Sequence, residues 1–286
     1  MSSPPAKRKR TETMSITRSE IWYKDGSVVL QAENTQFRVY WGILSQHSPF
    51  FRDLENLPQP PNQPTVDGCS VVELHDSAED VEYLLKALYD PHFLSQTTLP
   101  LAAVGALIRL GRKYDFQTLF ESARARITFE TPTTLEEYDA LIPDGGTYKP
   151  TRITSYPGFT LDLLTLVREN NILSALPVAY YHASRSRPGT LLDGIPRTDG
   201  TLALLAPVDL RLCLTGRERL LCQQFKEEHT MGCFVASQVP GCGRPAKCRA
   251  NRKCAFDRCV DENVVDSLYN LKGFSGWKKV FCAACY

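Results

Sequence analysis

The sequence predicts an α+β fold, in which a small sheet capped by a helical cluster precedes a mainly helical extension and a short cysteine-rich tail. Three observations predict it. Strand-like stretches gather before residue 75, helical apolar periodicity fills most of the chain from there to residue 236, and nine of the ten cysteines follow residue 212. Strands first and helices afterwards indicate an α+β plan rather than regular βαβ alternation.

Composition narrows the class of protein. The 286 residues are 43% hydrophobic and 23% charged, which is typical of a globular protein, and the net charge of +1 excludes a globally basic nucleic-acid binder while leaving room for local patches. No apolar run approaches the roughly 18 residues that a membrane span needs. The N-terminal stretch lacks the apolar core of a secretory signal. We therefore expect a nuclear or cytoplasmic protein without membrane contact, in which thiols stay reduced.

Residues 1–18 predict a disordered basic tail rich in Ser, Pro and Thr. The run KRKR at residues 7–10 has the composition of a nuclear-import signal. A solvated basic tail without any address function explains the same residues.

The strands are predicted in the next stretch. Residues 20–24 (EIWYK) and 27–33 (SVVLQAE) have strand composition, and the Asp25-Gly26 turn between them predicts a hairpin. Residues 36–39 and 70–74 predict two further strands. Between these, the prolines of residues 56–64 predict a loop.

Helix starts are predicted from capping residues. Ser48 followed by Pro49 predicts one helix, and Ser77 with Asp80 forms a capping box ahead of a second, which Asp90-Pro91 ends. Two more helices are predicted up to residue 130. In the extension, the predicted starts are Thr134 with Glu137, Thr160, Ser174, and Thr215 with Glu218.

Several quoted stretches carry a resemblance to a known family. DGSVVL at 25–30, FRVYWGILSQHSPFFRDL at 37–54, EDVEYLLKALYDP at 79–91 and LIRLGRKYDFQTLFESARARI at 107–127 stand in one order. This order resembles the BTB/POZ domain over residues 19–130, and residues 27–54 are similar to a large group of fungal, basidiomycete-type BTB proteins. Many BTB domains have a His where Tyr40 stands, so this sequence departs from the family pattern at that position. The resemblance implies homodimerisation or docking of a protein partner, and also allows a substrate adaptor of a cullin-type ubiquitin ligase.

Aromatic residues mark the predicted partner surface. Val39, Leu44 and Phe51 are expected in the core, where each would contribute roughly 1.5–3 kcal/mol. Trp22, Tyr23, Trp41 and Phe50 cluster near the same strands and helix. They predict a protein interface, because exposed aromatic anchors dominate binding energy. The alternative is that all four rings are internal.

The cysteine-rich tail, residues 237–286, predicts a structural zinc site. Cys282-x2-Cys285 has the spacing of a zinc knuckle, and Cys242-x5-Cys248 lies in a Gly- and Pro-rich loop. A Cys pair followed by a Trp and a terminal C-x-x-C is also similar to the ends of the fungal BTB proteins, so we favour these four ligands. Cys254 and Cys259 compete with the second pair, and free cysteines in a disordered tail remain the alternative. Cys213 and Cys222 are expected to be core residues.

The function that follows is non-enzymatic protein–protein interaction. The sequence contains no G-x-S-x-G, H-E-x-x-H, Walker A or G-x-G-x-x-G motif, and His182 is expected to be a satisfied structural histidine. An alternative is a nuclear regulator that contacts nucleic acid through the basic stretch 244–258. Its six basic residues are Arg244, Lys247, Arg249, Arg252, Lys253 and Arg258. A solvated basic loop, balanced by the acidic segment that follows it, is the explanation we prefer. The predicted domains are 1–18, 19–130, 131–236 and 237–286.

Overall fold

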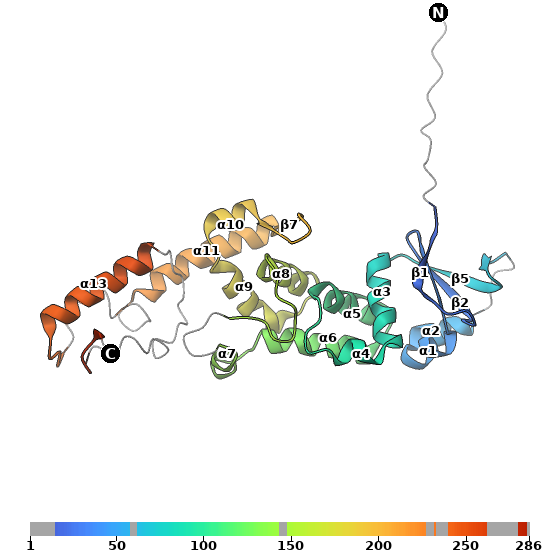
Figure 1. The fold of residues 1–286 in the computed structure, drawn as a ribbon, viewed down its shortest axis with the longest axis horizontal. Helices are drawn as coiled ribbons and strands as arrows, with labels where there is room; N and C mark the ends of the chain where they lie inside the picture. Colours follow the sequence, from blue (N-terminus) through green and yellow to red (C-terminus); the bar gives the residue numbers. More distant parts are fainter. Residues whose placement is uncertain are drawn as a thin grey trace, which may run out of the picture. The chain divides into compact units, whose positions relative to one another are not determined.

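The computed structural model describes residues 15–57, 62–142, 148–226, 232, 240–261 and 280–284 (Figure 1). The chain divides into two compact units. The first comprises the residues up to Gln96 together with Ala102–Ala123, and the second comprises Thr97–Leu101 and the residues from Arg124 onward. The basic run at residues 7–10 lies outside the described residues.

A five-stranded sheet forms the centre of the first unit. Its strands are β1 (Thr17–Trp22), β2 (Val28–Ala32), β3 (Thr35–Val39), β4 (Thr65–Val66) and β5 (Cys69–Leu74), in the order β1-β3-β2-β5-β4. β2 pairs antiparallel with β3 and parallel with β5, while β4 covers only the first two residues of β5. Most of the outer edge of β5 therefore lies beyond the reach of β4.

The predicted hairpin between the first two strands is wrong. β1 pairs in parallel with β3, and the hairpin joins β2 to β3 through Glu33, whose φ of +50° lies in the left-handed region. The turn at Gly26 instead carries the chain past β3. A Cβ on Gly26 would meet the carbonyl oxygens of Tyr23 and Val39 at 3.1 and 3.0 Å, so close backbone approach requires the glycine.

Two short helices follow β3, and the start of the second at Ser48-Pro49 was predicted. α1 spans Trp41–His47 and α2 spans Pro49–Glu55. Ser48 caps α2, because its Oγ accepts the Phe51 N–H at 3.1 Å, and the same hydroxyl donates to the Tyr114 carbonyl. This double role fixes α2 against the first unit's core. The predicted core residues Val39, Leu44 and Phe51 are fully buried.

The helical cluster consists of α3 (Ala78–Tyr89), α4 (Pro91–Ser95), α5 (Leu101–Lys113) and α6 (Gln117–Glu130). Ser77 caps α3 by accepting the Asp80 N–H at 3.1 Å, and α3 ends before Asp90, as predicted. Asp90 then caps α4. The largest fully buried side chains of the core include Phe37, Leu84, Leu85, Leu107, Ile108 and Phe116.

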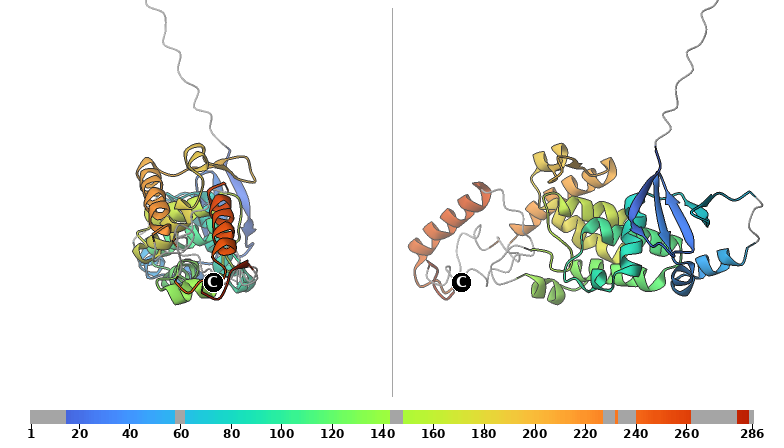
Figure 2. Two further views of the ribbon diagram at one scale, coloured as in Figure 1. Left: turned by 90° about the vertical axis from the view of Figure 1, so that its left-hand side faces the viewer. Right: turned by 45° about the vertical axis from the view of Figure 1, so that its right-hand side comes forward.

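The second unit is mainly helical (Figure 2). Its helices are α7 (Leu135–Leu141), α8 (Phe159–Glu169), the 3₁₀ turn η1 (Leu173–Ala175), α9 (Leu176–Ser184), α10 (Pro188–Asp193), α11 (Pro207–Gln224) and α13 (Pro245–Asp261). A short β6–β7 ladder, Ile195–Pro196 with Leu202–Ala203, accompanies them. Leu161, Leu164, Ala179, Ala183, Leu191 and Cys213 form a buried apolar cluster within this unit.

Three predicted helix starts in the extension are wrong. α8 begins after Gly158 rather than at Thr160. Gly158 has φ +93°, and a Cβ there would lie 2.6 Å from the Ala203 Cβ, so this position requires glycine. α9 follows Ala175 rather than Ser174. α11 begins at Pro207, eight residues before Thr215, whose hydroxyl bonds the Arg211 carbonyl inside the helix. The cap at Thr134 is confirmed, since its Oγ1 accepts the Glu137 N–H.

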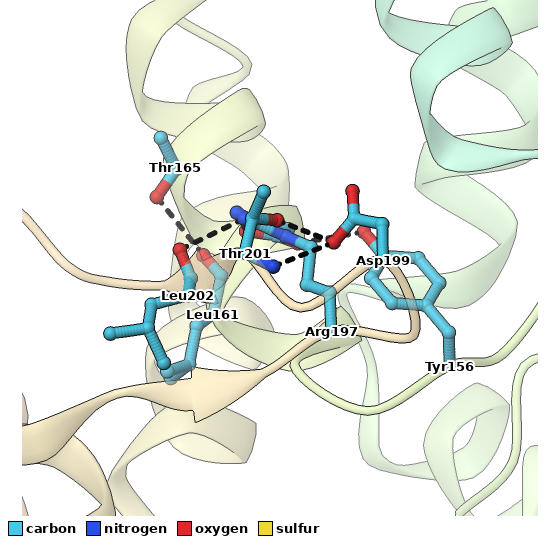
Figure 3. A network of polar contacts seen from close by, with 8 residues as sticks. Tyr156, Leu161, Thr165, Arg197, Asp199, Thr201 and Leu202 are labelled. Carbon is cyan, nitrogen blue, oxygen red and sulfur yellow. Dashed lines mark hydrogen bonds and ion pairs between the residues drawn. The ribbon is translucent and has the colours of Figure 1, made fainter.

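A partly buried ion pair anchors the β6–β7 ladder on α8 (Figure 3). Arg197 donates through Nε and Nη2 to both carboxylate oxygens of Asp162, at 2.7 and 2.6 Å. Its Nη1 donates to the Leu202 carbonyl at 2.8 Å, and Tyr156 also donates to Asp162. Bidentate geometry of this kind is the stronger form of an Arg–carboxylate pair.

The two cysteines of α11 differ. Cys213 is fully buried, as expected of a core residue. Burial raises the pKa of its thiol to about 11. Cys222 is exposed, so the expectation that it is a core residue is wrong. The nine-residue spacing is two and a half helical turns, which puts the two side chains on opposite faces of α11.

Candidate interaction surface and metal centre

The four predicted interface residues lie on or beside the sheet of the first unit. Trp22 ends β1, and the guanidinium carbon of Arg18 lies 4.4 Å from the centre of its ring. Trp22, Tyr23 and Trp41 are partly buried, while Phe50 is 42% exposed. None of the four rings is wholly enclosed, and their role as a partner interface stays a prediction.

Tyr23 belongs to a stack of three tyrosines. Its ring centre lies 5.2 Å from those of Tyr40 and Tyr89. The Tyr89 hydroxyl accepts the Tyr40 N–H and donates to the Tyr40 carbonyl, both at 3.0 Å. Burial raises the pKa of Tyr89 to about 12, which keeps the hydroxyl protonated for these bonds. Tyr40 also donates to Asp25 at 2.6 Å.

Trp41 and Phe50 share one buried neighbour, Phe51. The Trp41 ring meets Phe51 edge-on with centres 6.1 Å apart, and the Phe50 ring does so at 5.3 Å. Phe50 also lies 5.1 Å from Tyr114. These contacts hold Phe50 in place while leaving 42% of it exposed. A preoriented, exposed aromatic ring loses little conformational freedom when a partner covers it.

Three of the four predicted metal ligands come together in the tail. The sulfurs of Cys242, Cys248 and Cys282 all lie within 4.8 Å of one another, and those of Cys242 and Cys282 are 3.7 Å apart. Cys248 lies on α13 and is fully buried. Two side-chain bonds bring the distant segments together: Arg244 donates to the Phe281 carbonyl at 3.2 Å and Asn251 to the Val280 carbonyl at 2.8 Å.

This geometry fits a tetrahedral thiolate site. Zinc–sulfur bonds of about 2.3 Å put neighbouring sulfurs of a tetrahedron about 3.8 Å apart. The 3.7 Å separation matches that edge and is far longer than a disulfide bond of about 2.05 Å. The fourth predicted ligand, Cys285, lies outside the described residues. Among the competing cysteines, Cys254 is exposed on α13, and the Cys259 side chain is outside the described part of the structure.

The basic residues of the tail lie on α13 or directly before it. Arg244, Lys247, Arg249 and Lys253 are exposed. Arg252 is buried, with its Nη1 lacking a hydrogen-bond partner, and it follows Cys248 by one helical turn. A buried guanidinium at this position suits a site that carries the excess negative charge of several thiolates. The side chain of Arg258 is outside the described residues.

Sequence reasoning missed a pocket in the first unit. Its volume is about 600 Å³, and its lining comes from five separated segments, four of which contain Trp41, Glu55, Gln63 and Glu73. Of these four residues, only Trp41 was predicted from the sequence to belong to a binding surface. Gln63 lies in the proline-rich loop, where the composition predicts only irregular backbone.

The comparison with known families identifies the first unit. The model of the BTB/POZ domain matches residues 24–128. The curled sheet and the helices from α1 to α6 are accordingly a BTB/POZ domain, and a mainly helical extension follows it. No curated protein matches the chain. In the described part of the chain, none of the helices has both the length and the apolar composition needed to cross a bilayer.

Proposed function

We propose that this protein is a non-enzymatic interaction factor, in which the BTB domain forms a homodimer and docks a protein partner as a regulatory adaptor. BTB/POZ domains are in general protein–protein interaction modules. The observation that supports a docking role here is Phe50, which is 42% exposed yet held by Phe51 and Tyr114. Large aromatic side chains with few rotatable bonds are frequent hot spots of protein interfaces.

Light scattering tests the dimer and the place of Phe50 in it. The chain has a mass of 32.1 kDa, and the wild type is expected at twice that value. Phe50→Ala removes the exposed ring without opening a core cavity, so it is expected to shift the population toward monomer. Phe129→Ala is the matched control, because Phe129 is 40% exposed and lies at the end of α6, in the part of that helix that belongs to the second unit. A wild type that stays monomeric at high concentration contradicts self-association.

We further propose that the tail holds a structural zinc ion through Cys242, Cys248, Cys282 and Cys285. Four thiolates would close the coordination sphere and leave no open position for catalysis. Metal analysis of purified protein is expected to give about one zinc per chain. Cys248→Ser is expected to abolish this content, and Cys254→Ser, which changes an exposed cysteine of the same helix, is expected to preserve it. Metal-free wild-type protein contradicts the proposal.

The exposed basic residues of the tail support a second candidate, a nuclear regulator that binds nucleic acid. Lys247, Arg249 and Lys253 present three positive charges from α13. Binding of a duplex DNA probe that weakens steeply with salt, and that is lost when the three are changed to Gln, would favour this candidate. Binding that is absent at low salt contradicts it. A role as a cullin-type ligase adaptor depends on the family resemblance alone.

A further inference from the structure

A second binding feature of the BTB domain is the pocket beside β5. Its lining residues are Ser27, Val28, Trp41, Leu54, Glu55, Leu57, Gln63, Ser70, Val71, Val72 and Glu73. They come from the start of β2, from α1 and α2, from the loop after α2, and from β5. The pocket therefore lies where the helices and the last long strand of the sheet meet.

The edge of β5 is only partly covered there. The Val71 N–H donates to the Pro64 carbonyl at 2.9 Å, and the Val71 carbonyl accepts from Gln63 Nε2 at 3.2 Å. Both groups of Val71 thus point away from β2. Since strand residues alternate, Glu73 points its N–H and C=O to the same outer side. In the described part of the chain no main-chain partner covers Glu73 on that side, and an extended peptide could pair with it.

Two buried polar atoms at the pocket lack partners. Trp41 Nε1 is a donor, and Gln63 Oε1 is an acceptor. The orientation of the Gln63 amide is fixed, because its nitrogen must face the Val71 carbonyl. A buried group without a hydrogen bond costs roughly 1–3 kcal/mol. Each atom has less than 1 Å² exposed, so a ligand bonds them only when the Trp41 and Gln63 side chains turn toward the pocket. A peptide main chain offers the required acceptor and donor at every residue.

The charge of the pocket selects among peptides. Glu55 and Glu73 contribute two carboxylates to the lining, and none of the lining residues is basic. Glu55 is exposed and accepts the Ser45 hydroxyl at 2.9 Å, which holds it in place. Leu54, Leu57 and Val71 supply the apolar walls. Opposite charge at the rim and apolar contact inside favour a strand that carries Lys or Arg beside apolar residues.

We propose that this pocket binds an extended, basic peptide segment of a partner protein, which lengthens the sheet at Glu73 and bonds Trp41 Nε1 and Gln63 Oε1. The inference rests on the proposed interaction function and names the chemistry of the partner. Trp41 lies close to the Phe50 surface because both rings contact Phe51, but the two proposals are tested by different measurements, so each can fail without the other.

The test uses the full chain and a displayed library of random nine-residue peptides. Selection is expected to enrich peptides in which Lys or Arg alternates with apolar residues. The best peptide is then synthesised, and its affinity is measured by fluorescence anisotropy. An N-methyl group on the peptide bond that pairs with Glu73 is expected to abolish binding, because it removes the main-chain donor.

Three substitutions place the peptide in the pocket. Trp41→Phe keeps the ring against Phe51 but removes the N–H, and is expected to weaken binding about fivefold. Glu55→Gln and Glu73→Gln are expected to weaken it about threefold each and to reduce its salt dependence. Glu20→Gln is the matched control, since Glu20 is exposed on β1 at the opposite edge of the sheet. Thermal melting of each variant shows whether it is folded.

The outcomes separate the two proposals. If no peptide is enriched, or if the selected peptides bind all pocket variants as tightly as wild type, the peptide inference is overturned. Binding of a synthetic peptide of residues 1–14 alone would also overturn it, because the occupant would then be this chain itself. Light scattering of the same samples reports the dimer independently, so the proposed function stands or falls on that measurement.

Discussion

Lowering the pH is expected to destabilise the second unit through one buried histidine, His182. Its side chain is 6% exposed, and its ring stacks on Tyr148 with centres 4.3 Å apart. Its Nε2 is buried without a hydrogen-bond partner, so the sequence-based expectation of a satisfied histidine is wrong for this atom. Burial, followed by the nearby positive charge of Arg185, lowers the pKa of His182 from 6.5 to about 3.

The magnitude follows from proton linkage. A folded-state pKa below the unfolded value means that the unfolded chain binds the proton first, so stability falls as pH falls from 6.5 toward 3. At pH 5.0 the unfolded histidine is almost fully charged while the folded one is neutral, and the difference relative to pH 7.5 is about 2 kcal/mol. A folded pKa one unit higher gives nearly the same result at pH 5.0.

Urea unfolding followed by circular dichroism, at pH 7.5 and 5.0, measures this difference. Carboxylates also titrate in this range, so the relevant quantity is the loss in wild type minus the loss in His182→Phe. That variant keeps an aromatic ring beside Tyr148 and cannot titrate. His92→Phe changes an exposed histidine and serves as the control. If wild type and His182→Phe lose the same stability, or if the His182 proton resonances titrate near pH 6.5, the reasoning is refuted.

Three further predictions concern single sites. Chelation of the proposed zinc is expected to remove hydrogen-exchange protection around Cys248 on α13 while leaving the BTB domain protected; unchanged exchange in α13 would contradict the site. Phe51→Ala opens a cavity at a fully buried ring and is expected to cost about 3–5 kcal/mol of unfolding free energy, whereas Phe50→Ala is expected to cost under about 1 kcal/mol. Glu130→Gln weakens the bonds that this buried carboxylate accepts from the Tyr148 hydroxyl and two backbone N–H groups, and is expected to cost about 1.5–3 kcal/mol in the same denaturation assay. An unchanged midpoint would rule out that role.

The sequence predicted well where the signal is local. Ser48, Ser77 and Thr134 each cap the helix expected of them, because a cap joins a side chain to a backbone N–H only three residues away. Thr160 and Thr215 have the same residue type but do not cap. α8 starts instead after Gly158, a position that the close approach of Ala203 restricts to glycine, and no local pattern contains this contact across 45 residues.

Strand pairing failed for a related reason. The Asp25-Gly26 turn is a genuine turn, with the Gly26 N–H bonded to the Tyr23 carbonyl at 3.0 Å. A turn signal predicts that the chain reverses, yet it does not say which strand will lie alongside. β3, and not β2, lies beside β1: it pairs with β1 on one side and with β2 on the other. The central position of β3 is a property of the whole sheet.

The two candidate sites show how far such reasoning extends to function. Closely spaced cysteines predict a metal site from the sequence alone, because thiolates bind metal wherever the fold brings them together. Cys242, Cys248 and Cys282 are close together in the structure. Trp41 and Gln63 carry no such signal, since tryptophan and glutamine are ordinary residues until the fold buries their polar atoms. In the free domain, Trp41 Nε1 and Gln63 Oε1 lack hydrogen-bond partners, which costs free energy. The proposed homodimer does not account for this cost. A bound main chain would remove that cost at both atoms. The same two atoms that weaken the free domain would therefore make the pocket selective for a peptide.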